Sequence, residues 1–139
     1  MRREPAPPGG MPPPERAELG GATVELGPLA AEVADRYFAA HPEDAERYGR
    51  AGRLWAEHDT RHLLNWAFGA VDGHVELADQ VAWLAAVLEA RDFPLDHLAS
   101  NLDLAADVVA DRVAGGDEVA VQLRDAAALV RSTRTFLPG

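Results

Sequence analysis

The sequence predicts an all-α protein, and three observations support that class. Apolar residues recur at intervals of three and four along most of the chain, which is the spacing of one helix face. Gly and Pro separate these stretches, as they do where helices begin and end. No segment alternates apolar and polar residues with period two over strand length, so we expect no β-sheet. The length of 139 residues predicts one domain.

The composition fits a folded chain that binds neither nucleic acid nor membrane. A hydrophobic fraction of 47% is enough for a core, whereas a net charge of −10 disfavours nucleic acid and anionic membranes. No apolar run has the length of a membrane span, and no secretory signal is evident, so we expect a cytoplasmic protein. Cysteine is absent, which excludes thiolate metal ligands and thioether links to a cofactor. All 13 basic residues are Arg, a usage typical of GC-rich bacterial genomes.

The N-terminal segment is expected to differ from the rest of the chain. Residues 1–27 are rich in Pro and Gly and poor in large apolar side chains. Such a segment cannot bury enough surface to fold. We therefore predict a disordered Pro-rich tail over 1–27 and a helical domain over 28–135.

The first two helices are expected on either side of a proline. The pattern predicts a helix over 28–40, which His41 and Pro42 end because the residue before proline avoids the α conformation. Pro42 then opens a second helix. Gly49 and Gly52 weaken this second helix before the next one begins.

Three long helices follow a central one. The central helix is expected over 53–71 and ends at an Asp-Gly pair, which is typical of a C-cap. Apolar stripes then predict helices over 74–91, 94–113 and 117–130. The second of these starts at proline, and the third starts after Gly115-Gly116, with Asp117 as its N-cap.

The central helix has an unusual second face. At about 100° per residue, Trp55, Asp59, His62 and Trp66 fall within an arc of about 60°. Surface helices usually carry Glu, Lys or Gln there, so this arc suggests the wall of a pocket for a flat molecule with a polar centre. A structural alternative is that both tryptophans fill core space and Asp59 pairs with His62. Periodicity alone slightly favours that alternative.

Catalytic and metal-binding motifs are missing. The sequence contains no Gly-rich phosphate loop, no HExxH, no GxSxG and no EF-hand loop, so we expect no enzyme. His58 and His62 have the i,i+4 spacing that two metal ligands can use. Such pairs also arise often by chance, and we expect no metal site.

Three segments together resemble a known family. They read LAAEVADRYFAAHPED over 29–44, RAGRLWAEHDTRHLLNWAFGAVDGH over 50–74 and GGDEVAVQLRDAAALV over 115–130. Their order, with a Pro-initiated helix between the last two, resembles the phycobiliprotein-like non-haem globins, including the bilin biosynthesis-associated globins. The resemblance implies a globin-like helical bundle, and its most specific part is 55–73.

The resemblance also implies a ligand and a set of binding residues. The family's pigment-coordinating Asp matches Asp59, which would accept hydrogen bonds from pyrrole N–H groups. The family's chromophore-linking Cys matches Ala56, so a bound biliverdin or related bilin would be non-covalent. A flat ligand with anionic propionates also needs aromatic walls and nearby arginines, so the candidate site comprises Arg53, Trp55, His58, Asp59, His62 and Trp66, with Arg47, Arg50 and Arg61 as further candidate partners of the propionates.

The expected function is non-catalytic binding, sensing or carrying of a linear tetrapyrrole such as biliverdin. One alternative is a ligand-free interaction or regulatory module, similar to the non-haem globin domains of stress signalling. A filled core beside Asp59 would favour that alternative. A less favoured alternative is a haem globin with His74 or His97 as the axial ligand. A homodimer or another protein partner is compatible with each of these functions.

Overall fold

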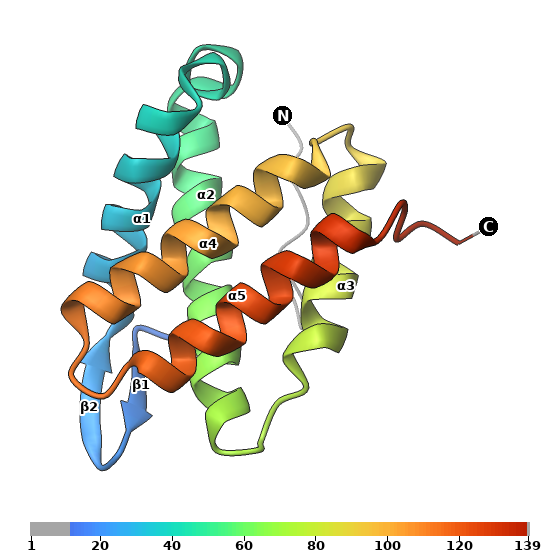
Figure 1. Ribbon diagram of the computed structural model, residues 1–139. Helices are drawn as coiled ribbons and strands as arrows, with labels where there is room; N and C mark the ends of the chain where they lie inside the picture. Colours follow the sequence, from blue (N-terminus) through green and yellow to red (C-terminus); the bar gives the residue numbers. More distant parts are fainter. Residues whose placement is uncertain (1–11, 139) are drawn as a thin grey trace.

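The computed structural model describes residues 12–138, which are mostly helical (Figure 1). The described elements are β1 (Arg16–Leu19), β2 (Ala22–Glu25), α1 (Leu26–Ala40), α2 (Pro42–Val71), α3 (Leu77–Ala90), α4 (Leu95–Arg112) and α5 (Asp117–Ser132). The expected all-α class is confirmed at this level, apart from the small hairpin. Among the described residues, no helix combines the length and apolarity that crossing a membrane requires.

The helices form two antiparallel pairs that cross each other. In Figure 1, α1 and α2 run side by side in opposite directions, and α4 and α5 form a second antiparallel pair in front of them. α3 lies beside α5, at the edge of the bundle away from α1. This arrangement leaves one long side of α3 without a neighbouring helix.

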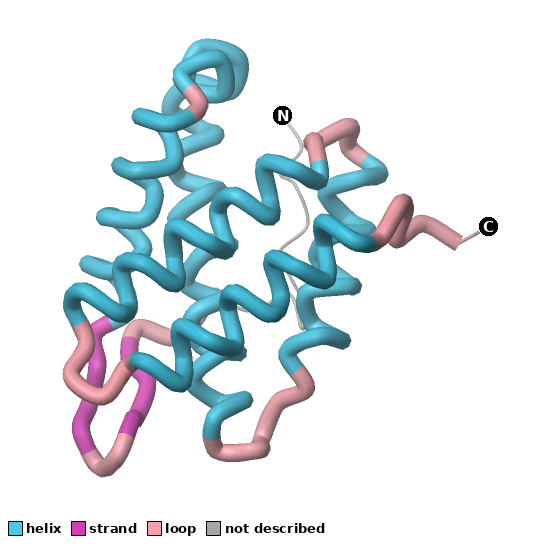
Figure 2. Tube along the Cα trace, in the orientation of Figure 1, coloured by secondary structure: helices cyan, strands magenta, loops and turns pink. Residues whose placement is uncertain are grey.

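The hairpin corrects the expectation that the chain has no strand. β1 and β2 pair antiparallel from Arg16 opposite Glu25 to Leu19 opposite Ala22, and they are the strands drawn in Figure 2. The turn uses Gly20 and Gly21 at φ of 57° and 82°, which other residues rarely adopt. Strands of four residues are too short for a clear period-two pattern.

The expected boundary of the tail at residue 27 therefore needs revision. The hairpin occupies 16–25, and α1 begins directly after it at Leu26 rather than at Pro28. The Leu26 backbone N–H donates to the Glu15 carbonyl at 2.9 Å, which closes the base of the hairpin. Residues 1–11 of the expected tail lie outside the described residues.

The helix boundaries otherwise follow the sequence signals closely. α1 ends at Ala40, where His41 and Pro42 were expected to end it. The second and central helices form one element, α2, which contains a break at Gly49 with φ 63° and ψ −152°. That conformation is essentially restricted to glycine, so Gly49 separates a short first arm of α2 from the long central arm.

The core lies between the two helix pairs and receives side chains from every described helix. Its largest fully buried side chains are Phe68, Leu26, Leu63, Leu64, Leu84, Leu102, Leu123, Val33, Val81, Val108, Val109 and Val119. Ala17, Leu19 and Val24 of the hairpin pack against its edge. The hairpin thus covers one end of the core, which is why its apolar residues face inward.

The C-terminal segment after α5 is bound to α3 through one carboxylate. Glu89 accepts hydrogen bonds from the Thr135 hydroxyl and from the Phe136 backbone N–H, the latter at 2.7 Å. These donors hold the pKa of Glu89 below its usual value. Glu89 thereby fixes the segment that follows α5 against α3.

Candidate functional site

The aromatic residues predicted on α2 form a continuous row of ring contacts. The ring centroids of Trp55 and His58 lie 4.9 Å apart, those of His58 and His62 lie 5.1 Å apart, and those of His62 and Trp66 lie 5.6 Å apart. Spacings of three and four residues place each ring over the next turn of the helix. His58, which connects Trp55 to His62 in this row, was not among the residues of the predicted arc, which were Trp55, Asp59, His62 and Trp66.

Burial divides this row into two parts. His62 and Trp66 are 5% and 7% exposed, and Trp66 belongs to the hydrophobic core. Trp55 and Asp59, one to three turns earlier, are only partly buried. The half of the row nearer the C-terminus of α2 therefore fills core space, as the structural alternative expected. Trp55 and Asp59, in its first half, border a cavity.

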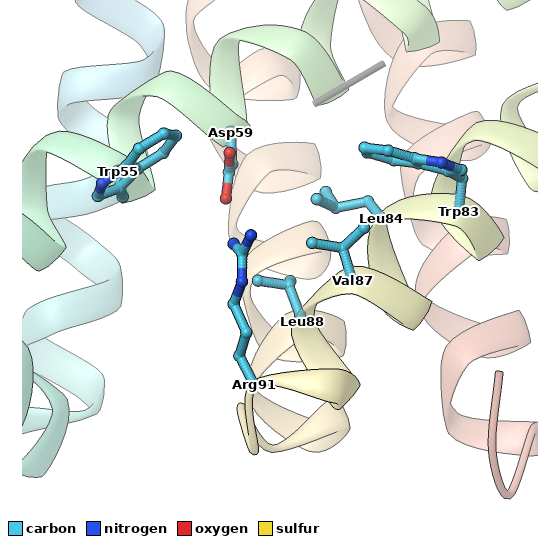
Figure 3. A pocket seen from close by; sticks show the side chains of 7 residues that line it. All are labelled: Trp55, Asp59, Trp83, Leu84, Val87, Leu88 and Arg91. Atoms are coloured by element: carbon cyan, nitrogen blue, oxygen red, sulfur yellow. The ribbon is translucent and has the colours of Figure 1, made fainter. Parts of the chain in front are cut away.

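That cavity lies between α2 and α3 and is very small. Its walls are Trp55, Asp59, Trp83, Leu84, Val87, Leu88 and Arg91 (Figure 3). Its volume is about 10 Å³, close to the minimum that a single water molecule needs. Pockets for drug-sized ligands measure roughly 300–1,000 Å³. In this structure the space beside Asp59 is filled by protein.

The carboxylate of Asp59 faces protein groups rather than an open pocket. Figure 3 shows the Arg91 side chain pointing toward Asp59 from the end of α3. On its own helix, Asp59 Oδ1 lies 3.2 Å from His58 Nδ1. The expected alternative partner of Asp59 was His62, one turn further along. Arg91 thus lies where the pyrrole N–H groups of a bilin would need to approach.

The arginine in the predicted site points elsewhere. Arg53 donates to Asp35 at 2.7 Å, to Glu57 at 2.6 Å and to the Ala31 carbonyl at 3.2 Å. The two carboxylates raise the pKa of its guanidinium. Arg53 therefore connects α2 to α1, and the structure does not bring it together with Asp59.

Two of the other candidate arginines also have partners. Arg61 donates to the carbonyls of Pro13 and Pro14 at 2.9 and 3.2 Å, which fixes the chain before the hairpin to α2. The Arg47 guanidinium lies over the Tyr48 ring, 5.2 Å from its centroid. Neither arginine lines the cavity beside Asp59.

The two histidines considered as haem ligands have different surroundings. His74 is exposed in the connection between α2 and α3. His97, near the start of α4, has its Nδ1 2.7 Å from Asp44 Oδ2. His97 therefore belongs to a polar cluster where α1, α2 and α4 meet.

This polar cluster was not predicted from the sequence. It comprises Tyr37, His41, Glu43, Asp44, His97 and Ser100, and we call it the junction cluster. The motif His41-Pro42-Glu43-Asp44 was interpreted as a helix end followed by a helix start. The sequence does place three ionisable residues, His41, Glu43 and Asp44, within four positions, and this could have indicated a site. Their partners on α4 depend on tertiary structure, which periodicity does not reveal.

No protein-family model, no curated protein and no solved structure matches this chain. The resemblance to the phycobiliprotein-like globins therefore remains a prediction based on the three quoted segments. What the protein does must be argued from its own geometry and surface.

Proposed function

We propose that this chain is a non-catalytic regulatory module with a globin-like fold, and that it acts by binding another protein. The observation that carries the proposal is the cavity of about 10 Å³ beside Asp59. A domain that works through a tetrapyrrole needs a far larger space in its interior. The crossed pairs α1–α2 and α4–α5 support the globin-like part of the proposal.

The binding surface in this proposal is the side of α3 that carries Trp83, and its residues Trp83 and Val87 also line the cavity beside Asp59. Trp83, Ala86, Val87 and Ala90 follow the i, i+3, i+4, i+7 spacing of a single helix face, and we call them the α3 face. Trp83 is 41% exposed, which is unusual for so large an apolar side chain. Tryptophan is also the residue most enriched among the anchors of protein interfaces.

The charge of the chain indicates the chemistry of the partner. The net charge of −10 favours a partner whose surface is basic, because opposite charge speeds association and suppresses wrong pairings. Asp79, four residues before Trp83 and exposed, lies on the same side of α3 and adds a carboxylate beside the α3 face. We therefore expect a partner with an apolar pocket for Trp83 and basic residues around that pocket.

Trp83→Ala tests this surface. Partners are identified by cross-linking in the cells that make the protein, then purified and titrated against it. We expect Trp83→Ala to weaken the affinity by about 30-fold, which corresponds to the loss of an anchor worth about 2 kcal/mol. Val121→Ala is the matched control, because Val121 is an apolar residue 53% exposed on α5. Equal effects of the two variants, or no effect of Trp83→Ala, would contradict the proposal.

A second candidate function is non-covalent binding of a linear tetrapyrrole such as biliverdin. It is favoured by the fact that Trp55 and Asp59 line the same cavity as Trp83, since an acid between aromatic walls suits such a ligand. Binding would require the Arg91 side chain to move away from Asp59 and the small cavity to widen. Ala56 excludes a thioether link, so acid–urea would release all of the pigment.

Biliverdin titration separates the two candidates. If the module proposal is right, the absorption spectrum of biliverdin stays unchanged when the protein is added. If the second candidate is right, the long-wavelength band shifts, and Asp59→Asn weakens binding by about tenfold or more because hydrogen bonds to a charged group are lost. His74→Ala is the control, since His74 is exposed and is not one of the cavity walls.

A further inference from the structure

The junction cluster brings together three groups that ligate metals. His41 follows the end of α1, Glu43 lies in the first turn of α2, and His97 lies in the first turn of α4. One ligand atom from each of the three lies within 4.8 Å of the other two. Glu43 Oε2 is 3.5 Å from His41 Nδ1 and 3.8 Å from His97 Nε2. Tetrahedral ligands at zinc distances are separated by about 3.4 Å, so small side-chain rotations complete the geometry.

The far nitrogen of each imidazole is already held by another side chain. His41 Nε2 lies 2.9 Å from the Ser100 hydroxyl, and His97 Nδ1 lies 2.7 Å from Asp44 Oδ2. These bonds fix both rings so that their other nitrogens point toward Glu43. Metal-binding histidines almost always have such an outer partner, often a carboxylate, which orients the ring and makes it a better ligand.

Asp44 is built into this arrangement as a buried charge. It is 2% exposed and also accepts a hydrogen bond from the Tyr37 hydroxyl. Burial and the neighbouring Asp44 raise the pKa of Tyr37, which keeps the phenol protonated as a donor. Burying a carboxylate is costly unless its surroundings compensate the charge. Here both partners of Asp44 come from other helices. The Tyr37 hydroxyl lies on α1, and His97, whose other ring nitrogen can bind a metal, lies on α4.

The junction cluster has a path to solvent. The Glu43 side chain is 62% exposed, whereas those of His41 and His97 are 17% and 20% exposed. An ion would therefore approach past Glu43 and reach the two imidazoles behind it. The cluster thus offers carboxyl and imidazole groups, which are the side chains that bind divalent transition metals in proteins.

We propose that His41 Nδ1, Glu43 and His97 Nε2 bind one divalent first-row transition metal ion of the zinc type. Two imidazoles and one carboxylate suit Zn²⁺, Co²⁺ or Ni²⁺ better than Ca²⁺ or Mg²⁺, which prefer oxygen ligands throughout. Three protein ligands leave a coordination position for water. The site joins α1, α2 and α4, and it is independent of the α3 face and of the cavity beside Asp59.

Calorimetric titration of the full chain with Zn²⁺ tests the proposal. We expect one ion per chain. Glu43→Gln is the decisive variant, because this exposed side chain can lose its charge without disturbing the fold, and it should weaken binding by about tenfold or more. His97→Ala should weaken binding by about 100-fold or more, since loss of an outer partner alone costs about 10–100-fold. Ser100→Ala removes the outer partner of His41, and it should weaken Zn²⁺ binding by about 10–100-fold.

Two controls and a second probe complete the test. His74→Ala and His58→Ala should bind Zn²⁺ like the unchanged protein, because neither residue belongs to the junction cluster. Co²⁺ should give visible absorption bands that Glu43→Gln alters. The proposal is overturned if no saturable binding of one ion per chain occurs, if Glu43→Gln binds with unchanged affinity, or if His58→Ala abolishes binding and thereby points to the His58–His62 pair. Circular dichroism verifies that each variant is folded. If His97→Ala does not fold, the titration of Glu43→Gln alone tests the proposal.

Discussion

Replacing Phe68 with alanine is expected to lower the free energy of unfolding by about 3–5 kcal/mol. Phe68 is 1% exposed and lies in the central arm of α2, within the hydrophobic core. The loss combines the transfer free energy of the ring with the cost of the cavity that remains. Because domains of this size are stable by only about 5–15 kcal/mol, a large part of the population would unfold at moderate temperature. Urea denaturation followed by circular dichroism measures the change.

Val121→Ala provides the matched comparison for Phe68→Ala. Val121 is 53% exposed, so its truncation should change the free energy of unfolding by no more than about 0.5 kcal/mol. A change below about 1 kcal/mol for Phe68→Ala would mean that the core does not close around this ring as described.

Asp44→Ala is expected to destabilise the protein by about 1–3 kcal/mol when metal ions are removed by a chelator. The substitution leaves the His97 Nδ1 and Tyr37 hydroxyl groups without the acceptor that they share. A buried donor without an acceptor costs about 1–3 kcal/mol, and the Tyr37 hydroxyl is such a donor, whereas the His97 side chain is partly exposed. Denaturation in urea, with chelator throughout, measures the loss.

Asp44→Asn and Asp125→Ala are the controls for this second prediction. The asparagine keeps one oxygen acceptor, so its effect should be smaller than that of alanine. Asp125 is exposed on α5, and its removal should have little effect. A loss for Asp44→Ala that is no larger than for Asp125→Ala would show that the junction cluster contributes nothing to stability.

Helix periodicity predicted most of the helices. The helix expected over 94–113 is α4, Leu95–Arg112, and the expected end at His41 is where α1 stops. Both follow from local chemistry, namely an apolar stripe in one case and proline in the other. The hairpin was missed because its strands are short and its Gly20-Gly21 turn also fits a segment without structure.

The candidate sites show where sequence reasoning reaches its limit. Helix geometry alone placed Trp55 near Asp59, and both line one cavity. The same geometry does not reveal which neighbour covers each side of a helix. It therefore could not show that Arg53 reaches across to Asp35 on α1, or that Arg91 fills the space beside Asp59. The meeting of His41 with His97 requires the packing of α1 against α4, which no local pattern contains.

The glycine break in α2 has a consequence for how the molecule fluctuates. Gly49 interrupts the helical backbone between the first arm, which carries Glu43 and Asp44, and the central arm, which carries Phe68. Helical cooperativity does not extend across such a break, so the first arm forms a unit that opens at a lower free energy than the core. Amide hydrogens of the first arm should therefore exchange with solvent before those of the central arm. The lifetime of any ion held by Glu43 would be set by this local opening, while the rest of the domain stays folded.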